Sequence, residues 1–535
     1  MPNYIVQGNT SLYRVSQGGV ATTLTLPTGV TLYGTGTPCR FAQFGEWVIV
    51  VNGATKDLFI GLDNTVRVLK ILPPSVAPTL AASATTAGFG AGARIVAYTQ
   101  QVRDPLTRKL IMESGFSPVA THTVPGGGGG ILATNIEVSE HQHADARGVY
   151  YSMAGGTYLF AAHWIDSNIV TDFDVLVTTL AGVLPVVPEQ APDFKLIAAW
   201  KDRLWGVPRL EIDNVRWSEE RTFYSFPSTN EIVVPKIETD TSGVTAIIPR
   251  RDDIGFGRKD ALYRIIGDDN ESYQRQKVDD IGVEVQESVV VVRNIAYFLG
   301  RANGRVGVFE WSDAGVRNVS ERQVDAWFNT DTYFNRSRWE NARGRYNPDT
   351  DSYELLLASQ GQTTQDYWVS FRIRDRVWHG PHKTAAFTNF ATGTDGNLSG
   401  TLGSTTAARL SVFGGTDGFL YKRDSSVVND HNSAIDFDID TPFIHDGAPD
   451  IEKVWMQPTI HSRIEAAGTL TVTPKVGGLG ASAGTAISHT LTLGRERLRR
   501  LGLGRYVQLN MRLNTVDRKV RIFGIELPWL HRGRR

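Results

Sequence analysis

A phrase of two short apolar strands joined by a charged or glycine-rich turn recurs along this chain. Its clearest copy lies in residues 201–219, KDRLWGVPRLEIDNVRWSE. Residues 196–207 carry an apolar run that includes Trp205, and residues 214–218 alternate polar with apolar, so we expect one strand in each. The proline, aspartate and asparagine residues between them supply turn chemistry. The phrase therefore predicts strand pairs and few helices.

Variants of the phrase follow downstream, as expected for a fold built from repeated sheets. They read IIPRRDDIGFGRKDALY at 247–263, VVVVRNIAYFLGRANGRVGVF at 289–309 and LSVFGGTDGFLY at 410–421. The phrases begin near residues 195, 244, 288 and 343, about 45 to 55 residues apart, which is the length of a four-stranded propeller blade. A further blade is expected at about 385–425, and the strands of residues 1–74 would close the ring with the late ones. The pattern predicts a β-propeller of six or seven blades.

Glycine and the scarcity of helical signals agree with this class. The 53 glycines are about a tenth of the chain, above the usual ~7%, as tight turns between short strands require. The best helix candidate is residues 321–328, ERQVDAWF, which Ser320 could cap. We therefore expect an all-β protein with one short helix.

Two further segments differ from the propeller phrases in their sequence pattern. Residues 75–190 contain strands about ten residues apart and a proline followed by five glycines at 125–130, a spacing typical of a small β-sandwich. This segment resembles the fibronectin type III insertions of phage structural proteins. Residues 431–535 alternate in the same way and predict a second sandwich-like domain. The expected organisation is propeller strands at 1–74, an inserted fibronectin III or Ig-like sandwich at 75–190, the main propeller at 191–430 and a C-terminal β domain at 431–535.

Charge is segregated along the chain. From residue 495 onward there are eleven arginines and one lysine against three acids, a local charge of +9, whereas the remainder carries 43 basic and 53 acidic residues, or −10. Such a split favours docking against an acidic surface or nucleic acid. Alternatively, the arginines pair with acids of the same subunit or of its neighbour.

Cysteine content and the termini indicate the compartment. The one cysteine, Cys39, excludes an intramolecular disulfide and a cysteine-based zinc site, as in proteins that fold under reducing conditions. The N-terminus lacks the features of a signal peptide, and no apolar run reaches the ~18 residues of a membrane helix. We expect neither secretion by the usual route nor a membrane span.

Few residues suggest catalysis. His141 and His143 lie among acids in EVSEHQHAD (137–145), which could touch a metal, although a solvated loop is the better interpretation. The acid pairs Asp252–Asp253, Asp268–Asp269 and Asp279–Asp280 could serve a glycosidase, but each sits where a hairpin turn is expected. Arginines 250, 251 and 258 could clamp a carboxylate as in sialidases, yet the repeat motif of that family is missing. No P-loop, nucleophile elbow or zincin motif is present, so we expect no enzyme activity, cofactor or metal.

An arginine row stands out in residues 368–382, WVSFRIRDRVWHGPH. Strand alternation would place Arg372, Arg374 and Arg376 on one face, where they could line a channel for a polyanion such as DNA through phosphate contacts. The alternative, which we favour, is that the row bridges to acids of the next blade. Arg497, Arg499 and Arg500 of the basic C-terminal segment are further candidates for a DNA channel or a subunit interface.

Several phrases occur in an order that resembles one protein family. They are KLIAAWKDRLWG, NVRWSE, SFP, IGFGRKDALYRI, VDDIGV, VVVVRNIAYFLGRANGRVGVFEW, RYNPDTDSYELLL, WVSFRIRDRVW and the final RKVRIFGIELPW. From about residue 194 onward the chain is similar to tail nozzle, or packaged-DNA-stabilisation, proteins of short-tailed bacteriophages. The inserted sandwich departs from the simplest members of that family.

The resemblance implies a virion protein made in the bacterial host cytoplasm. It implies a hexameric ring below the portal and adaptor proteins, next to tail fibre or spike proteins, that retains double-stranded DNA and conducts it during ejection. Loops at 252–258 and 302–305 are candidates for gating the channel. The alternatives are a glycan-binding or glycan-cleaving propeller of the tailspike kind, and a hub of a long flexible tail.

Overall fold

The computed structural model describes most of the chain and divides it into two compact units. The described ranges are 4–16, 20–28, 30–32, 38–84, 88–104, 106–139, 144–176, 191–235, 242–394, 409–415, 420–422, 429–430, 433–434, 437–441, 443–445, 447, 450–464, 468–477, 487–491, 494–497, 501–513 and 520–531. One unit comprises Met1–Thr363, Ser370–His379 and Thr392–Leu410, and the other comprises Thr364–Val369, Gly380–Ala391 and Ser411–Arg535.

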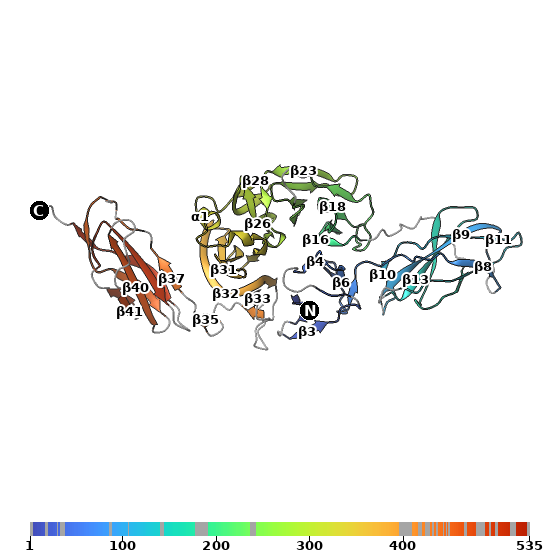
Figure 1. Cartoon of the computed structure of the whole chain (residues 1–535), viewed down its shortest axis with the longest axis horizontal. Helices are drawn as coiled ribbons and strands as arrows, with labels where there is room; N and C mark the ends of the chain where they lie inside the picture. The colour runs from blue at the N-terminus through green and yellow to red at the C-terminus, as the bar shows by residue number, and fades with distance from the viewer. Residues whose placement is uncertain are drawn as a thin grey trace. The chain divides into compact units, whose positions relative to one another are not determined.

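The chain folds as a β-propeller whose strands pair with their neighbours in chain order. The sheet orders are β1-β2-β3, β4-β5-β6-β7, β16-β17-β18-β19, β20-β21-β22-β23, β24-β26-β27-β28 with β25 beside β26, and β29-β30-β31-β32-β33-β34. Their pairing is antiparallel wherever the register is defined, for example in β16 with β17 and β26 with β27. In Figure 1, β4, β16, β18, β23 and β28 follow one another around an arc. The predicted all-β propeller class is confirmed, whereas closure of the ring by the earliest strands stays a prediction.

The strand bounds of this part follow the repeated phrases. They are β1 Tyr4–Gly8, β2 Ser11–Val15, β3 Ala21–Leu24, β4 Arg40–Phe44, β5 Trp47–Val51, β6 Leu58–Ile60, β7 Val66–Val68, β16 Phe194–Trp200, β17 Arg203–Pro208, β18 Asn214–Trp217, β19 Glu231–Val233, β20 Ala246–Pro249, β21 Asp253–Gly257, β22 Leu262–Ile266, β23 Gln274–Asp279, β24 Gly282–Val283, β25 Val290–Val292, β26 Ile295–Ala302, β27 Arg305–Ser312, β28 Gly315–Asn318, β29 Arg343–Asn347, β30 Ser352–Ala358, β31 Gln365–Arg372, β32 Val377–Thr394, β33 Arg409–Gly415 and β34 Leu420–Lys422.

Apolar side chains fill the spaces between successive sheets. Leu12 of the first sheet packs in one buried cluster with Leu58 of the next, and Trp205 shares a cluster with Phe256 of the following sheet. The next interface includes Phe298. Burying both faces of each sheet against its neighbours supplies the main favourable term in folding.

Two expectations about local structure are wrong. Residues 196–207 are two strands, not one, because Lys201 and Asp202 both adopt positive φ angles, 46° and 54°, the geometry of a two-residue hairpin turn. The helix α1 spans Asp325–Asn329 and begins after Val324 without a side-chain cap. Ser320 instead accepts a hydrogen bond from the Val308 N–H, at 3.1 Å, so its hydroxyl serves the sheet.

The other helical elements are short. They are the 3-10 helices η1 Gln286–Ser288 and η2 Arg336–Asn341. Among the described residues, no helix combines the length and the apolar character that crossing a bilayer requires.

Two neighbouring sheets approach each other closely at Gly282, the first residue of β24. A Cβ on Gly282 would lie 1.8 Å from the Lys259 carbonyl oxygen and 2.6 Å from the Asp260 nitrogen. Backbone atoms cannot move aside as flexible side-chain ends can, so Gly282→Ala is expected to lower the free energy of unfolding by about 1–3 kcal/mol. The matched control is Gly126→Ala, since a Cβ there meets nothing within 4 Å. Urea unfolding of both variants checks this, and equal midpoints would contradict the close approach.

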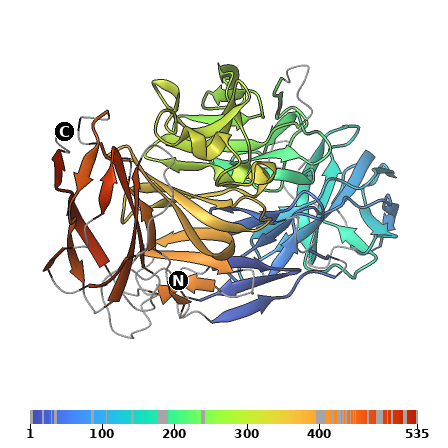
Figure 2. The ribbon, with the colours of Figure 1, turned by 60° about the vertical axis from the view of Figure 1, so that its left-hand side comes forward.

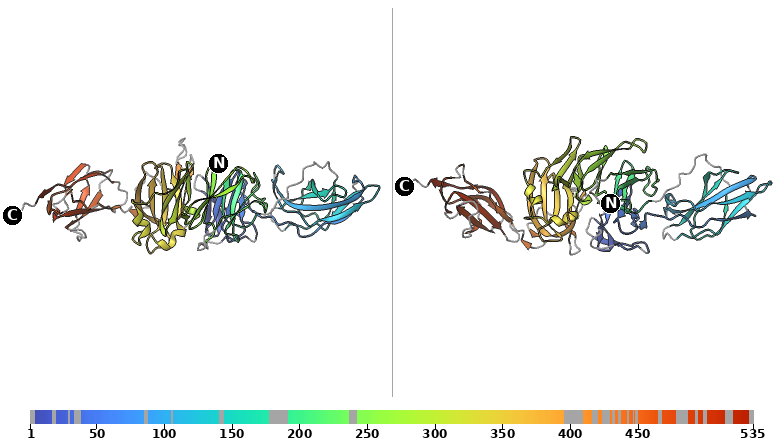
Figure 3. Two further views of the ribbon diagram at one scale, coloured as in Figure 1. Left: turned by 90° about the horizontal axis from the view of Figure 1, so that it is seen from above. Right: turned by 45° about the horizontal axis from the view of Figure 1, so that its top comes forward.

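The insertion is a two-layer β-sandwich. One sheet has the order β10-β9-β13-β14 with β11 also paired to β9, and the other has the order β15-β12-β8. Tyr98 and Val149 of the first sheet share a buried cluster with Ile131 and Val175 of the second, as the inner faces of two packed sheets do. Figure 3 shows these light blue and cyan strands as two layers. The bounds are β8 Thr79–Ser83, β9 Gly92–Arg103, β10 Leu110–Glu113, β11 Ala120–Val124, β12 Gly130–Thr134, β13 Ala146–Ser152, β14 Leu159–Ile165 and β15 Phe173–Val175.

The C-terminal part is the predicted sandwich-like β domain. Its sheets have the orders β37-β44-β40-β41, β43-β38-β46 and β42-β39-β45. Figure 2 shows its red strands side by side. Trp455 is fully buried at the core with Leu470 and Leu509. The bounds are β35 Asn429–Asp430, β36 Ser433–Ala434, β37 Phe437–Asp440, β38 Lys453–Trp455, β39 Thr459–Ile464, β40 Gly468–Gly477, β41 Ile487–Leu491, β42 Gly494–Arg497, β43 Gly502–Gly504, β44 Tyr506–Leu513, β45 Val520–Glu526 and β46 Trp529–His531.

Candidate functional site

Charged residues gather near the starts of the first strands of several propeller sheets. Arg40 opens β4, Lys195 is the second residue of β16, Glu287 lies in η1 just before β25, and Arg343 opens β29. β16 contacts both β4 and β20, and β29 contacts η1. Since the first strands run in the same direction around a propeller, their starts lie on one face of it. We call these four residues, with Lys259, the inner-strand cluster.

Lys259 joins the cluster from the neighbouring hairpin. It follows β21, whose last residue, Gly257, pairs with Ala246 at the start of β20. The turn that holds Lys259 packs against Gly282. Four cations and one carboxylate from five sheets therefore lie near one another.

The contacts within the cluster are specific. The Arg40 Nε lies 2.8 Å from the Glu287 Oε1, and the Arg40 Nη1 donates to the Lys195 carbonyl oxygen at 3.1 Å. The Arg343 Nη1 donates to the carbonyl oxygens of Glu340 and Ala342, at 3.2 and 3.0 Å. Backbone carbonyls do not neutralise a guanidinium, so positive charge is in excess here.

The pKa shifts of two members reflect the charges of the others. Burial, together with the charges of Arg40 and Lys259, lowers the pKa of Lys195. Burial also lowers the pKa of Arg343, which Glu287 opposes and Arg40 reinforces. Both shifts mean that the surroundings disfavour the cationic forms.

The predicted arginine row does not form one strand face. β31 ends at Arg372, and the next four residues form the turn to β32. Arg372 pairs with Asp375 of the same turn at 3.1 Å, Arg374 is exposed, and Arg376 lies 3.2 Å from Glu310 of the neighbouring sheet. The alternation expected for these arginines fails because Arg376 adopts a positive φ of 57° inside a hairpin turn.

The basic residues of the C-terminal domain are described only in part. Arg497 lies in β42 and pairs in register with Thr459 of β39. Arg499 and Arg500 lie outside the described residues. The roles expected for these three arginines stay predictions.

Acids that could have formed a hydrolytic pair are bound to basic side chains. Asp253 lies 2.9 Å from the Arg250 Nε, and Arg250 also pairs with Asp313 in the β27–β28 turn of the next sheet. Asp268 pairs with Lys201 at 2.5 Å. These bridges connect neighbouring strands and sheets, which is a structural role.

Other members of the acid pairs and of the arginine group make an ion pair or local hydrogen bonds. Arg258, fully buried, pairs with Asp213 at 2.6 Å. Asp269 accepts the Ser272 N–H at 2.9 Å, as expected of a turn aspartate. Asp279 accepts the Asp280 N–H at 2.7 Å, and the Arg251 N–H donates to Asn294.

The described acids of the candidate metal motif, Glu137 and Asp145, bind different parts of the insertion. Glu137 accepts hydrogen bonds from the backbone and hydroxyl of Ser75, at 2.6 and 2.9 Å. Asp145 accepts from the Arg103 N–H at 3.0 Å and pairs with Arg108. Glu140, His141 and His143 lie outside the described residues. Among the residues that are described, no three histidine, cysteine or acidic side chains gather as metal ligands.

The proposed gating segments differ from each other. Residues 253–257 are the buried strand β21, so this segment is not a free loop and the expectation is wrong for it. Asn303 and Gly304 form a turn with positive φ angles between β26 and β27, in agreement with a loop tip.

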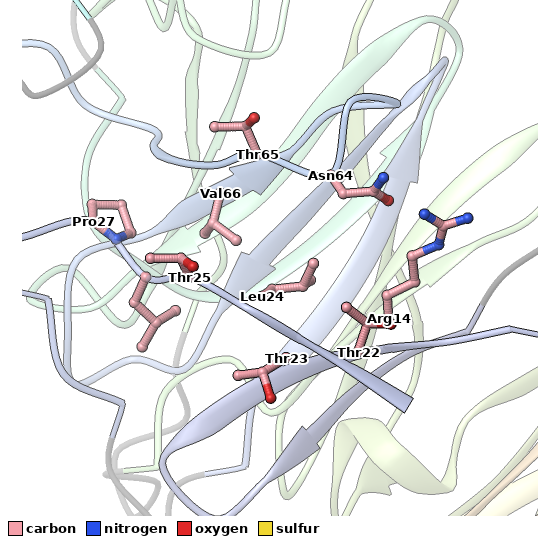
Figure 4. Close-up of a pocket in the computed structure, with 10 residues that line it drawn as sticks. Arg14, Thr22, Thr23, Leu24, Thr25, Pro27, Asn64, Thr65 and Val66 are labelled. Atoms are coloured by element: carbon pink, nitrogen blue, oxygen red, sulfur yellow. The ribbon is translucent and has the colours of Figure 1, made fainter. Parts of the chain in front are cut away.

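A shallow pocket of about 300 Å³ lies between the first two sheets. Figure 4 shows Leu24 in its middle, with Arg14 and Asn64 toward one side and Thr25 and Pro27 toward the other. Arg14 is the one titratable residue of its lining, so this pocket offers no acid and base for catalysis.

A larger groove of about 900 Å³ is lined by the β4–β5 hairpin, the insertion and the β16–β17 turn. Its walls include the aromatic residues Phe44, Trp47 and Tyr224. Asp104 in the same groove caps a turn, since Thr107 donates to it through its N–H and hydroxyl, and these bonds lower the Asp104 pKa. A general acid requires a raised pKa instead.

Among the carboxylates that the structure describes, Asp57 has the most strongly raised pKa, and it lines neither hollow. Burial raises its pKa well above the ordinary value, although the Phe194 N–H donates to it at 2.6 Å. The folded-state pKa thus exceeds the unfolded value of about 3.9, so between these values the folded chain binds more protons and its stability falls as pH rises.

Asp57→Asn is expected to remove that fall. The stability difference between the variant and the native chain should shift in favour of the variant as pH rises from about 4 through the raised pKa. Urea unfolding at several pH values measures it, with Asp202→Asn, an exposed carboxylate, as control. A constant difference across the pH range would show that the Asp57 pKa is not raised.

Comparisons with known proteins give distant likenesses. No family model and no curated protein matches the chain. Among solved structures, streptogramin B lyase is 10% identical, with 65% of this chain and 84% of that chain covered and a TM-score of 0.25. A glycoside hydrolase family 43 arabinoxylan arabinofuranohydrolase from Bacillus subtilis is 9% identical, with 91% and 94% covered and a TM-score of 0.17. The PorZ component of Porphyromonas gingivalis is 10% identical, with 97% and 80% covered and a TM-score of 0.21. At these TM-scores no activity follows for this chain.

Proposed function

We propose that this chain is the ring-forming subunit of a bacteriophage tail nozzle, which extends the tail tube, retains packaged DNA and conducts it during ejection. The proposal assigns it to the virion tail. Its partners would be further copies of itself, the portal and adaptor proteins, tail fibres or spikes, and double-stranded DNA.

The segregation of charge carries the proposal. A C-terminal segment of +9 stands against −10 elsewhere, on a propeller in which Asp253 and Asp268 form ion pairs with Arg250 and Lys201. Heterologous contacts that close into a ring require two different, complementary faces, and opposite charge supplies complementarity. The order of phrases shared with tail nozzle proteins supports the same function.

Mass photometry of the purified chain tests this proposal. The expected result is a species about six times the 58.9 kDa subunit mass, which dissociates as salt rises because exposed charges are screened. A chain that remains monomeric at low salt and high concentration, also with the adaptor ring of its own virion, would contradict it.

A glycan-binding or glycan-cleaving propeller is the second candidate. The groove of about 900 Å³ favours it, because Phe44, Trp47 and Tyr224 line it beside polar residues such as Glu46, the mixture common in small-molecule sites. A glycan array and a polysaccharide-release assay separate the candidates. Binding or release that Tyr224→Ala abolishes would favour this function, and the nozzle proposal expects neither signal.

A further inference from the structure

The inner-strand cluster carries more positive charge than its neighbours neutralise. Arg40, Lys195, Lys259 and Arg343 surround one acid, Glu287, and Glu340 lies beside Arg343. In the described part of the chain no carboxylate lies within ion-pair distance of the Lys195 ammonium, although this side chain is only partly exposed. A partly buried cation without a counter-ion is unfavourable, so the fold keeps it here at an energetic cost.

From this arrangement we infer that the starts of the first propeller strands form a binding site for a phosphate group. The excess of cations favours a multiply charged anion over a single carboxylate, since Coulomb attraction scales with charge. Arg40 and Arg343 supply guanidinium groups, which match phosphate geometry, and Lys195 and Lys259 add point charges. Burial and, to a lesser extent, the charges of Arg40 and Lys259 lower the pKa of Lys195, and a bound anion would oppose both effects by favouring the charged ammonium.

The site is assembled by the fold. Arg40 is fixed by Glu287 and by the Lys195 carbonyl, so its guanidinium is held in place before a ligand arrives. Such preorganisation reduces the entropy lost on binding. The inference does not rest on the proposed tail function, since a phosphate group can belong to a free anion or to a nucleic acid backbone.

Calorimetric titration with inorganic phosphate and with a short single-stranded oligonucleotide, at constant ionic strength, tests it. The central variant is Lys195→Met, which removes the charge but keeps the length, and the ammonium makes no hydrogen bond or ion pair to a described residue that it could break. We expect binding at least tenfold weaker than in the native chain. Lys109→Met, which removes an exposed lysine of the insertion, should bind as the native chain does, and Lys195→Glu should abolish binding.

The two ligands distinguish the source of the phosphate. Lys195-dependent binding of inorganic phosphate assigns the site to a small anion, and Lys195-dependent binding of the oligonucleotide alone assigns it to nucleic acid. The inference fails if the native chain binds neither ligand, or if Lys195→Met binds them unchanged while melting at the native temperature. If the chain is monomeric but binds phosphate, the phosphate site stands and only the proposed nozzle function is contradicted.

Discussion

Glu354→Ala is expected to lower the free energy of unfolding by about 3–5 kcal/mol, because it leaves a buried arginine without its counter-ion. The Arg345 and Glu354 side chains are 3% and 2% exposed and form an ion pair. Asn347 also donates to the Glu354 Oε1 at 2.8 Å. Removing the carboxylate therefore takes a buried acceptor away from two donors. Chemical denaturation followed by tryptophan fluorescence measures the loss.

A matched control lies in the same sheet. Arg372 and Asp375 form an ion pair whose side chains are 43% and 47% exposed. Solvent screens such pairs, so Asp375→Ala should change stability by less than about 1 kcal/mol. If the two substitutions destabilise the chain equally, burial is not what makes the Glu354 pair important.

Trp205→Ala is expected to cost about 3–5 kcal/mol, as large-to-small substitutions of buried aromatics do. Trp205 is fully buried and stacks on Trp217 with ring centroids 4.8 Å apart. Its ring also meets Tyr273 edge-on at 5.2 Å, from the next sheet. The substitution thus opens a cavity between two neighbouring sheets.

Thermal unfolding compares this variant with Tyr158→Ala, which truncates an aromatic residue that is 64% exposed. The melting temperature should fall strongly for Trp205→Ala and remain close to native for Tyr158→Ala. A small effect of Trp205→Ala would mean that the two sheets are not held together by this interface.

The class of fold could be predicted from the sequence because each blade repeats one pattern. Runs such as 289–309 contain enough apolar residues and turn signals to indicate their strands and spacing. The hairpin at Lys201–Asp202 was missed, since two-residue turns with positive φ are usually signalled by asparagine and glycine. The arginine row failed for a related reason, because alternation assumes an unbroken strand and a turn begins after Arg372.

The inner-strand cluster could not be predicted from local patterns. Arg40, Lys195, Glu287 and Arg343 belong to different sheets and are far apart in the sequence. No spacing rule connects them, and only the stacking of successive sheets brings the starts of β4, β16 and β29 together. Lys195 stands within the phrase KLIAAW as an ordinary strand lysine, so its missing counter-ion is visible only in three dimensions.

The acid pairs show the converse case, in which the sequence suggests a site that the fold does not form. Asp252–Asp253 and Asp268–Asp269 could have formed a hydrolytic site on sequence grounds. The fold instead places Asp253 against Arg250 and Asp268 against Lys201. The contacts of each acid, and not its spacing in the sequence, decide which role it can take.

Single-particle imaging of the assembled protein tests the central claim most directly. We expect closed six-fold rings of propeller subunits around an open channel, with the basic C-terminal segment of one copy facing an acidic surface of the next. Isolated monomers, two-fold dimers or open filaments in the images would contradict it.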